Sequence, residues 1–528
     1  MVLLTLAAGQ FLMALDSSVM NVSIATVADD LDTTVTGIQT AIVLYTLVMA
    51  MLMVTGGKIG SIIGRRRAFT IGLVIYCSGS LTTALAPNLG VLLFGWSLLE
   101  GIGASLIMPA IVALIAGNFP TEGRPRAYGL IGAAGAIAIA VGPLIGGLAT
   151  TYASWRLVFV GEVFVGAGIF LFSRRIADEP VENPPHLDLV GSVLWALGMG
   201  LAIFGVLRSG EWGWVIANDG APTVFGALSP VIWFILGGLA MIGLFMRHVR
   251  RLDVEGGEPL VTPSLFKNEQ MTGGLIMFFF QFVIMMGLFY VIPLYLSVAL
   301  GLSAIDTGLK ITPLSLTMLL AAAGIPKFFP TVSPRKVVEL SLIAAVFGIV
   351  LLFSAMDVNA SAEIVTGPLM LIGLAMGGLA SQLGSVAVSA VPADESPEVG
   401  GLQNTATQFG ASLGTALAGS VLIASLSASF LTGVTENPAV PPEVSSQATV
   451  ELSAGVPFIS DADLETALED AGLDAATTQA IVDTNEKARV DGLRSALALL
   501  AIVGLIALFF TKRIPTTQPG AAEAVGST

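Results

Sequence analysis

Three acidic residues, Asp16, Glu100 and Glu162, interrupt long apolar stretches in the first third of the chain. An ionised carboxylate at the centre of a bilayer costs about 3 kcal/mol, so it must be paired, solvated in a cavity or protonated. A carboxyl group under these constraints can take up and give back a proton or a small cation. We therefore predict that the three residues couple proton and substrate movement, with sodium as the alternative ion.

Two of the acids have a structural alternative. Asp16 begins a polar stretch, so its side chain could serve only to hydrogen-bond across helices. Glu162 is expected two turns from the outer end of its helix, from where its side chain could reach the membrane interface by snorkelling. Neither alternative requires a proton to move.

The composition predicts the elements that position these acids. Of the 528 residues, 55% are hydrophobic and 11% are charged, and the mean hydropathy is +0.87. A soluble domain carries about 25% charged residues, so most of this surface must face a lipid bilayer. The short alternating runs of an outer-membrane barrel are absent. We predict an all-α polytopic membrane protein.

Several classes of function are excluded. The single cysteine, Cys77, rules out an intrachain disulfide and a cysteine-based metal cluster. The net charge of −14 comes without the basic stripe that nucleic-acid binding requires. His186 and His248 form no H-E-x-x-H pair, and no P-loop or G-x-S-x-G motif is present. We predict no enzyme activity, no cofactor and no metal site, so the energy for any transport would come from an ion gradient.

Apolar runs of about 20 residues, the length that crosses the hydrocarbon core, recur along the chain. The first begins at Val2 without a basic n-region, so we interpret it as a retained span and not as a signal peptide. We predict about fourteen spans, near 3–27, 36–56, 68–87, 89–115, 127–150, 155–173, 188–207, 226–246, 272–299, 307–328, 337–355, 364–390, 401–424 and 493–511.

The charges test this count. The residues that follow even-numbered spans are basic: Lys58, Arg65, Arg66, Arg67, Arg124, Arg126, Arg174, Arg175, Arg247, Arg250, Arg251, Lys327, Arg335, Lys336, Lys512 and Arg513. The exit of span 12 is the exception, with Asp394, Glu395 and Glu398. Because basic loops remain in the cytoplasm, we predict a protein of the cytoplasmic (inner) membrane with both termini cytoplasmic.

The spans divide the chain into three parts. We predict an amino-terminal six-helix bundle at 1–174, a linker with two extra spans at 175–271, and a carboxyl-terminal six-helix bundle with a short tail at 272–528. An acidic segment at about 425–492 is expected to form a solvated external hairpin, with a helix that begins after Ser460. The alternative is an acidic mouth that gathers cations.

A glycine- and arginine-rich segment joins spans 2 and 3, where glycines allow a tight reversal and arginines hold the loop in the cytoplasm. Its candidate gating residues are Gly57, Gly60, Ser61, Gly64, Arg65 and Arg66. The segment resembles the signature loop of the major facilitator superfamily, G-x-L-x-D-x-x-G-R-K-x. In that family the aspartate is thought to latch the loop to neighbouring helices. Here Ser61 replaces it, so any latch would be a neutral hydrogen bond.

Further motifs extend the resemblance to the fourteen-span drug:proton antiporters of that family. Gly142, Pro143, Gly146 and Gly147 look like the antiporter motif of span 5, in which Gly142 and Gly146 share one helix face. The segments 15–25, 155–159 and 400–414 look like the group's motifs in spans 1, 6 and 13. In the span-4 motif, Ser97 stands where the group has arginine and Glu100 where it has glutamine. Glu162 occupies a position that is commonly asparagine.

Other polar residues are expected inside the bundles. The candidates for lining a cavity are Asn21, Gln281, Gln382, Asn404 and Gln408. Neutral groups of this kind more often bond between helices than bind ligands. Span 9 is rich in Met and Phe, a subset of which could line a pliable apolar pocket.

The resemblance implies two six-helix bundles that rock about a central site, with two extra central spans. We expect a monomeric exporter of lipophilic, cationic small molecules that exchanges them for protons by alternating access. Two alternatives remain open. One is a proton-coupled exporter of a lipid, a metabolite or an endogenous antibiotic on the same fold, and the other is a membrane enzyme or sensor.

Overall fold

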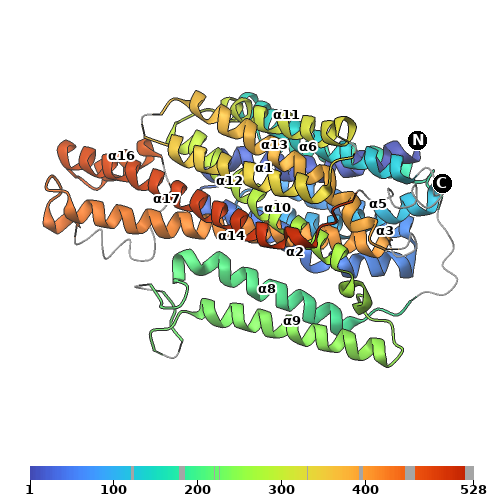
Figure 1. Ribbon diagram of the computed structural model, residues 1–528. Coiled ribbons are helices and arrows are strands. Elements are labelled where there is room, and N and C mark those ends of the chain that lie inside the picture. The colour runs from blue at the N-terminus through green and yellow to red at the C-terminus, as the bar shows by residue number, and fades with distance from the viewer. Residues whose placement is uncertain are drawn as a thin grey trace.

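The computed structural model describes residues 1–119, 124–177, 185–218, 221–224, 226–329, 331–358, 360–391, 396–445, 458 and 460–517. Asp394 and Glu395, the side chains of Arg124, Arg126 and Glu398, and residues 446–457 of the acidic segment lie outside the described part. Within it the chain is helical apart from loops and two isolated bridges near Leu228. Figure 1 shows long helices lying side by side, with the N-terminus at one end.

The helices, in chain order, have the following bounds. They are α1 (Val2–Asp30), α2 (Val35–Ile63), α3 (Arg65–Ala84), α4 (Leu89–Leu92), η1 (Leu93–Glu100), α5 (Gly101–Asn118), α6 (Arg124–Tyr152), α7 (Arg156–Ser173), α8 (Leu189–Trp212), α9 (Pro230–Val254), η3 (Pro263–Lys267), α10 (Glu269–Leu294), η4 (Tyr295–Ala299), α11 (Ala304–Phe328), α12 (Pro334–Ala355), η5 (Ala362–Val365), α13 (Thr366–Val388), α14 (Ser396–Glu436), α16 (Asp461–Asp470), α17 (Ala475–Phe510) and η6 (Thr511–Arg513).

The predicted polytopic helical fold is confirmed. Thirteen helices of the described chain are long and apolar enough to cross a membrane. The polar helix α3 has 20 residues and packs along the span formed by α4, η1 and α5. It is less apolar because it begins with three arginines and carries Ser80 and Thr83, whose hydroxyls bond to buried acids of other helices. The sequence predicts fourteen spans, and α3 is the predicted span that falls outside these thirteen.

The turn between α2 and α3 is shorter than predicted. Gly57 and Gly60 lie inside α2, which continues to Ile63, so the expectation that they form part of a reversal is wrong. The chain turns at Gly64 alone, whose φ of 100° lies in the left-handed region that glycine enters without a steric penalty. A hydrophobic span predicts where a helix crosses the membrane, but not where its backbone hydrogen bonds end.

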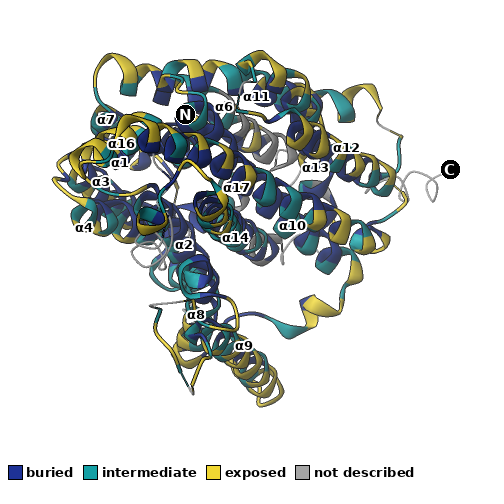
Figure 2. Cartoon of the chain, turned by 90° about the vertical axis from the view of Figure 1, so that its left-hand side faces the viewer, coloured by how far each residue is buried: buried dark blue, intermediate teal, exposed yellow. Residues whose placement is uncertain are grey.

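The end of the bundle that carries this turn and the N-terminus is called the basic end below, and the end from which α14, α16 and α17 project is called the hairpin end (Figure 1). Helices α1 to α7 are called the first half below, and α10 to α17 the second half. Figure 2, a view along the bundle, shows α8 and α9 projecting from it beside α2 and α14. An apolar cluster fills the groove between these helices, with Val43 and Leu47 from α2, Met199 and Ile203 from α8, and Ala416 from α14.

The two halves meet closely toward the hairpin end. Gln39 of α2 donates to the Thr415 carbonyl of α14 over 3.2 Å, and Ser412 of α14 donates to the Val43 carbonyl over 3.1 Å. The Ile305 amide of α11 donates to the Thr151 hydroxyl of α6 over 3.0 Å. Toward the basic end a cavity of about 270 Å³ lies between the halves. The contact surface between the two halves, called the seam below, is therefore closed toward the hairpin end and hollow toward the basic end.

Close approach of α6 and α11 depends on glycine. A Cβ atom on Gly147 would lie 2.6 Å from the Ala304 carbonyl oxygen and 2.8 Å from the Ile305 Cα, and Gly308 of α11 faces the Pro143 carbonyl in the same way. Both glycines therefore allow backbone to pack on backbone across the seam.

The acidic segment extends the carboxyl-terminal half beyond the bundle. Helix α14 has 41 residues and α17 has 36, well above the roughly 20 that cross a membrane. Helix α16 begins after Ser460, whose hydroxyl accepts from the Asp463 amide, as predicted. Arg489 of α17, which the sequence did not single out, is 1% exposed, pairs with Asp461 of α16 and donates to the Val298 carbonyl.

We expect the variant Arg489→Gln to lower the apparent melting temperature by about 2–5 °C, because a buried charged hydrogen-bond network is lost. Thermal unfolding followed by intrinsic fluorescence in detergent measures this. Lys487→Gln is the matched control, since Lys487 lies two residues away and is exposed. Equal melting temperatures for the two variants would show that the Arg489 contacts do not stabilise the hairpin.

We expect Gly147→Ala to separate α6 from α11 toward the hairpin end. Overpacking costs about 1–3 kcal/mol, which corresponds to roughly a tenfold shift in a conformational equilibrium. The reporter is the rate of disulfide formation between Thr151→Cys and Ile305→Cys in a Cys77→Ser background. Gly168→Ala is the control, because no atom lies within 4 Å of a Cβ built there. An unchanged rate in Gly147→Ala would exclude the proposed steric dependence.

Candidate functional site

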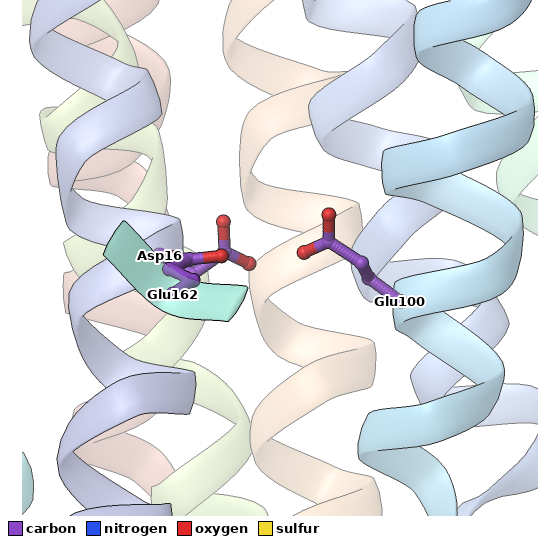
Figure 3. A group of neighbouring side chains, drawn as sticks. All are labelled: Asp16, Glu100 and Glu162. Atoms are coloured by element: carbon purple, nitrogen blue, oxygen red, sulfur yellow. The ribbon is translucent and has the colours of Figure 1, made fainter. Parts of the chain in front are cut away.

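The three predicted acids come together in the amino-terminal half. Asp16 lies on α1, Glu100 closes the π-helical segment η1, and Glu162 lies on α7. One carboxylate oxygen from each lies within 4.8 Å of the others. Figure 3 shows the carboxyl groups pointing toward one another. Their exposed fractions are 1%, 0% and 2%, so the cluster is enclosed by protein.

Burial of Glu162 corrects one expectation. The alternative that its side chain reaches the membrane interface is wrong, because the carboxylate points inward. Its Oε2 atom accepts hydrogen bonds from the Tyr76 hydroxyl over 3.1 Å and from the Ser80 hydroxyl over 3.0 Å. Both donors lie on α3, which was predicted only as a span.

The other two acids also accept from neutral donors. The indole Nε1 of Trp96 lies 2.9 Å from Oδ1 and 3.1 Å from Oδ2 of Asp16. The Thr83 hydroxyl donates to Oε1 of Glu100 over 3.2 Å. In the described part of the chain, Oε2 of Glu100 and Oε1 of Glu162 have no hydrogen-bond partner. The cluster therefore keeps two buried acceptor atoms unoccupied.

Glycines place these side chains within reach of one another. A Cβ on Gly79 would lie 2.5 Å from Cγ of Glu100, and a Cβ on Gly95 would lie 2.8 Å from the Thr83 hydroxyl oxygen. Helix α3 and the π-helical segment can therefore cross in close contact. A π-helical turn is uncommon and recurs at functional sites, because the wider turn redirects side chains.

Within the described residues, the groups that act on the cluster include no counterion. Those groups are the three acids themselves, the phenols Tyr45 and Tyr76, and neutral donors. Two ionised carboxylates about 4.8 Å apart repel by roughly 3 kcal/mol at an effective dielectric constant near 20. Three charges at this spacing are therefore unstable, and the arrangement favours binding of one or more protons or a small cation.

The candidate gating residues lie around the cavity at the basic end. Gly57, Gly60, Ser61 and Arg65 line it, together with residues 259–262 after α9 and Gly401 and Leu402 of α14. Ser61 donates to the Lys58 carbonyl of its own helix over 2.7 Å. Arg65 donates to the Ala113 carbonyl over 3.2 Å and Arg66 to the Ile176 carbonyl over 3.1 Å, and these bonds tie the turn to the ends of α5 and α7.

The antiporter-motif residues lie on two faces of α6. Gly142 and Gly146 face Ser18 and Val19 of α1, so the two glycines lie on one face of α6, as predicted. Gly147 and Pro143 face α11 across the seam. The motif therefore lies between the helix that carries Asp16 and the other half of the protein.

The remaining polar candidates do not join the cluster. Asn21 donates to the Ser17 carbonyl of its own helix, and Gln281 of α10 donates to the Met376 carbonyl of α13. Gln382 is buried on α13, whereas Asn404 and Gln408 are half-buried on α14. Gln281 thus makes the interhelical bond expected of such residues.

Sequence reasoning missed the donors around the acids. Trp96 is four residues before Glu100, a spacing that places two side chains on one helix face and could have linked them. The pairing of Ser80 and Thr83 with acids of other helices had no comparable signal. Gln39, which bonds to α14 and accepts from the Tyr290 hydroxyl over 3.3 Å, was likewise not singled out.

Comparison with known proteins agrees with this architecture. A tetracenomycin C resistance and export protein of Streptomyces glaucescens is 28% identical over 433 residues, which cover 80% of this chain and 76% of that protein. A puromycin resistance protein of Streptomyces alboniger is 30% identical over 425 residues, which cover 79% of this chain and 81% of that protein.

A solved bacterial homologue of the human lysosomal transporter Spinster, in an inward-facing and occupied conformation, aligns with a TM-score of 0.60. The alignment covers 97% of this chain and 95% of the solved chain at 14% sequence identity, which shows that the two folds are alike. The family model described as Major Facilitator Superfamily matches residues 6–415. This chain therefore belongs to the Major Facilitator Superfamily and is a multi-pass membrane transporter, related to drug and antibiotic exporters and not to enzymes.

Proposed function

We propose that this transporter exports lipophilic, preferentially cationic compounds in exchange for protons, and that the proton binds at the cluster of Asp16, Glu100 and Glu162. The observation that carries the proposal is the enclosed set of three carboxylates, on which no counterion acts and which keeps two unoccupied acceptor oxygens in the part of the chain that the structure describes. Such a set is stabilised whenever one positive charge is added.

The exchange follows from the electrostatic repulsion among the three carboxylates. A proton or a cationic cargo each relieves the repulsion among the carboxylates, so binding of one weakens the attraction for the other. Uptake of a proton then favours release of cargo, and loss of the proton restores the attraction. The ion could also be sodium, because three carboxylate oxygens can bind either ion.

Alternating access would come from rocking of the half at 1–174 against the half at 272–528. The close seam toward the hairpin end and the cavity toward the basic end are features of one of the two alternating states. We place the basic end and both termini in the cytoplasm, because basic residues gather there. The acidic hairpin would then lie outside the cell, and each monomer would hold a complete pathway.

A second candidate keeps the fold and changes the cargo. Relatives of this chain are named for export of, or resistance to, tetracenomycin C and puromycin. In this structure the acids are at most 2% exposed, so a neutral or anionic cargo could use another part of the seam while the cluster binds only protons. Transport of such a cargo would depend on the acids without competition by lipophilic cations.

The test is efflux of ethidium from proteoliposomes under an imposed pH gradient. We expect Asp16→Asn, Glu100→Gln and Glu162→Gln each to lower gradient-driven efflux by roughly tenfold, because a neutral amide cannot take up the coupling proton. Glu465→Gln, on the exposed surface of α16, is the control and should transport as the unmodified protein does.

Two further arms separate the alternatives. A sodium gradient at constant pH should drive no efflux if protons are the coupling ion. Efflux of puromycin that is insensitive to competing ethidium would favour the second candidate. Full gradient-driven ethidium transport by a variant that lacks all three carboxylates would overturn the proposal.

A further inference from the structure

One π-helical turn connects the acid cluster to the seam between the two halves. Segment η1 carries Trp96, Ser97 and Glu100. Glu100 belongs to the cluster and Trp96 donates to Asp16, whereas the Ser97 hydroxyl donates to the Ala41 carbonyl of α2 over 2.8 Å. A single rigid turn thus contacts both the proposed proton site and the helix that forms the seam.

Trp96 is held by its two neighbours. It is 1% exposed, and its ring stacks on the Tyr45 ring of α2 with centroids 5.0 Å apart and planes 11° from parallel. An indole N–H only donates, and here it lies within hydrogen-bond distance of both oxygens of Asp16. Both oxygens are strong acceptors only while Asp16 is ionised, because protonation turns one of them into a hydroxyl that donates its own hydrogen and accepts more weakly.

A proton on Asp16 changes this contact. The new O–H needs an acceptor, and the groups facing Asp16 are Glu100 from η1, Glu162 from α7, Tyr45 from α2 and Tyr76 from α3. Unoccupied acceptor atoms are present on Glu100 and Glu162 within the 4.8 Å cluster. The protonated carboxyl group therefore donates to another acid or to the Tyr45 hydroxyl, which also has no hydrogen-bond partner in the described chain, and the bond from the indole to the protonated oxygen weakens.

The seam lies close to the other side of Trp96. Ala41 and Tyr45 contact η1, while Gln39 and Val43 on the same helix hold α14. These four residues of α2 span about 9 Å at the rise of an α-helix. A shift of the indole or of η1 is therefore passed on to the α2–α14 contact within two helical turns.

We propose that Trp96 is a positioning residue that transmits the protonation of Asp16 to the α2–α14 seam, through its stacking on Tyr45 and the bond from Ser97 to Ala41. This inference rests on the proposed function, because it requires a proton to bind at the cluster. It also gives Ser97 a role at a position where the antiporter motif has arginine, since a neutral hydroxyl ties η1 to α2 without adding a charge beside Asp16.

The test measures how pH changes closure of the seam in the full-length protein. The reporter is disulfide formation between Thr151→Cys and Ile305→Cys in a Cys77→Ser background, at a site on α6 and α11 away from Trp96. Each rate is divided by that of a reference pair on the hairpin, Ser429→Cys and Asp491→Cys, which carries the pH dependence of the reacting thiolate itself. In reconstituted protein we expect this ratio to depend on pH, and we expect Asp16→Asn to remove that dependence. Trp96→Phe keeps a stacking ring but has no N–H, and should reduce the pH-dependent change roughly fivefold or more.

Controls separate transmission from damage to the fold. Trp214→Phe replaces a 39% exposed tryptophan in the α8–α9 loop and should retain the full pH dependence. Ser97→Ala removes only the bond to Ala41 and should also weaken the dependence, which keeps the test valid if Trp96→Phe does not fold. Folding is checked by the apparent melting temperature of each variant.

The outcomes distinguish this inference from the proposed function. A pH dependence that is lost in Asp16→Asn but complete in both Trp96→Phe and Ser97→Ala would overturn the role of Trp96 and leave proton binding intact. The absence of any pH dependence in the parent protein, together with normal transport by Asp16→Asn, would overturn both.

Discussion

Burial of negative charge without a counterion is the constraint on which the rest of the structure depends. Asp16, Glu100 and Glu162 lie in a low-dielectric interior, where every carboxylate oxygen needs a donor, a proton or a cation. Neutral donors satisfy part of this need, since an indole and hydroxyl groups stabilise a negative charge without fixing it as an arginine would. The site can therefore gain or lose a positive charge at modest cost, which a permanent ion pair would prevent.

Glycines allow the surrounding helices to pack closely both at the acid cluster and at the seam. Gly79 and Gly95 bring α3 against η1, and Gly147 and Gly308 bring α6 against α11. The hydrophobic driving force between helices is weak in lipid, and the close packing that small residues allow stabilises the contact instead. Helix α8 fills the groove beside α2 and α14 with an apolar cluster, so movement along that seam must involve it as well. The ion pair of Arg489 with Asp461 and the hydrogen bond from Arg489 to the Val298 carbonyl add rigidity to the hairpin end of the second half.

Sequence-based expectations failed where a result depended on neighbours. The segment around Gly57 was taken for a loop because its glycines suggest a turn, yet only Gly64 adopts a positive φ. The snorkelling of Glu162 was plausible from its distance to the helix end, but donors on α3 draw the side chain inward. In both cases the local pattern was compatible with two outcomes, and a tertiary contact selected one of them.

The sequence by itself determined the helical membrane fold and the identity of the buried acids, because both follow from the cost of placing polar groups in hydrocarbon. It also predicted the helix after Ser460, since an N-cap is a local interaction. Only the tertiary structure decided that the three acids meet, that Trp96 lies between them and α2, and that the seam is closed toward the hairpin end. These features depend on how helices distant in sequence pack and rotate against one another, and no short-range pattern specifies such rotations.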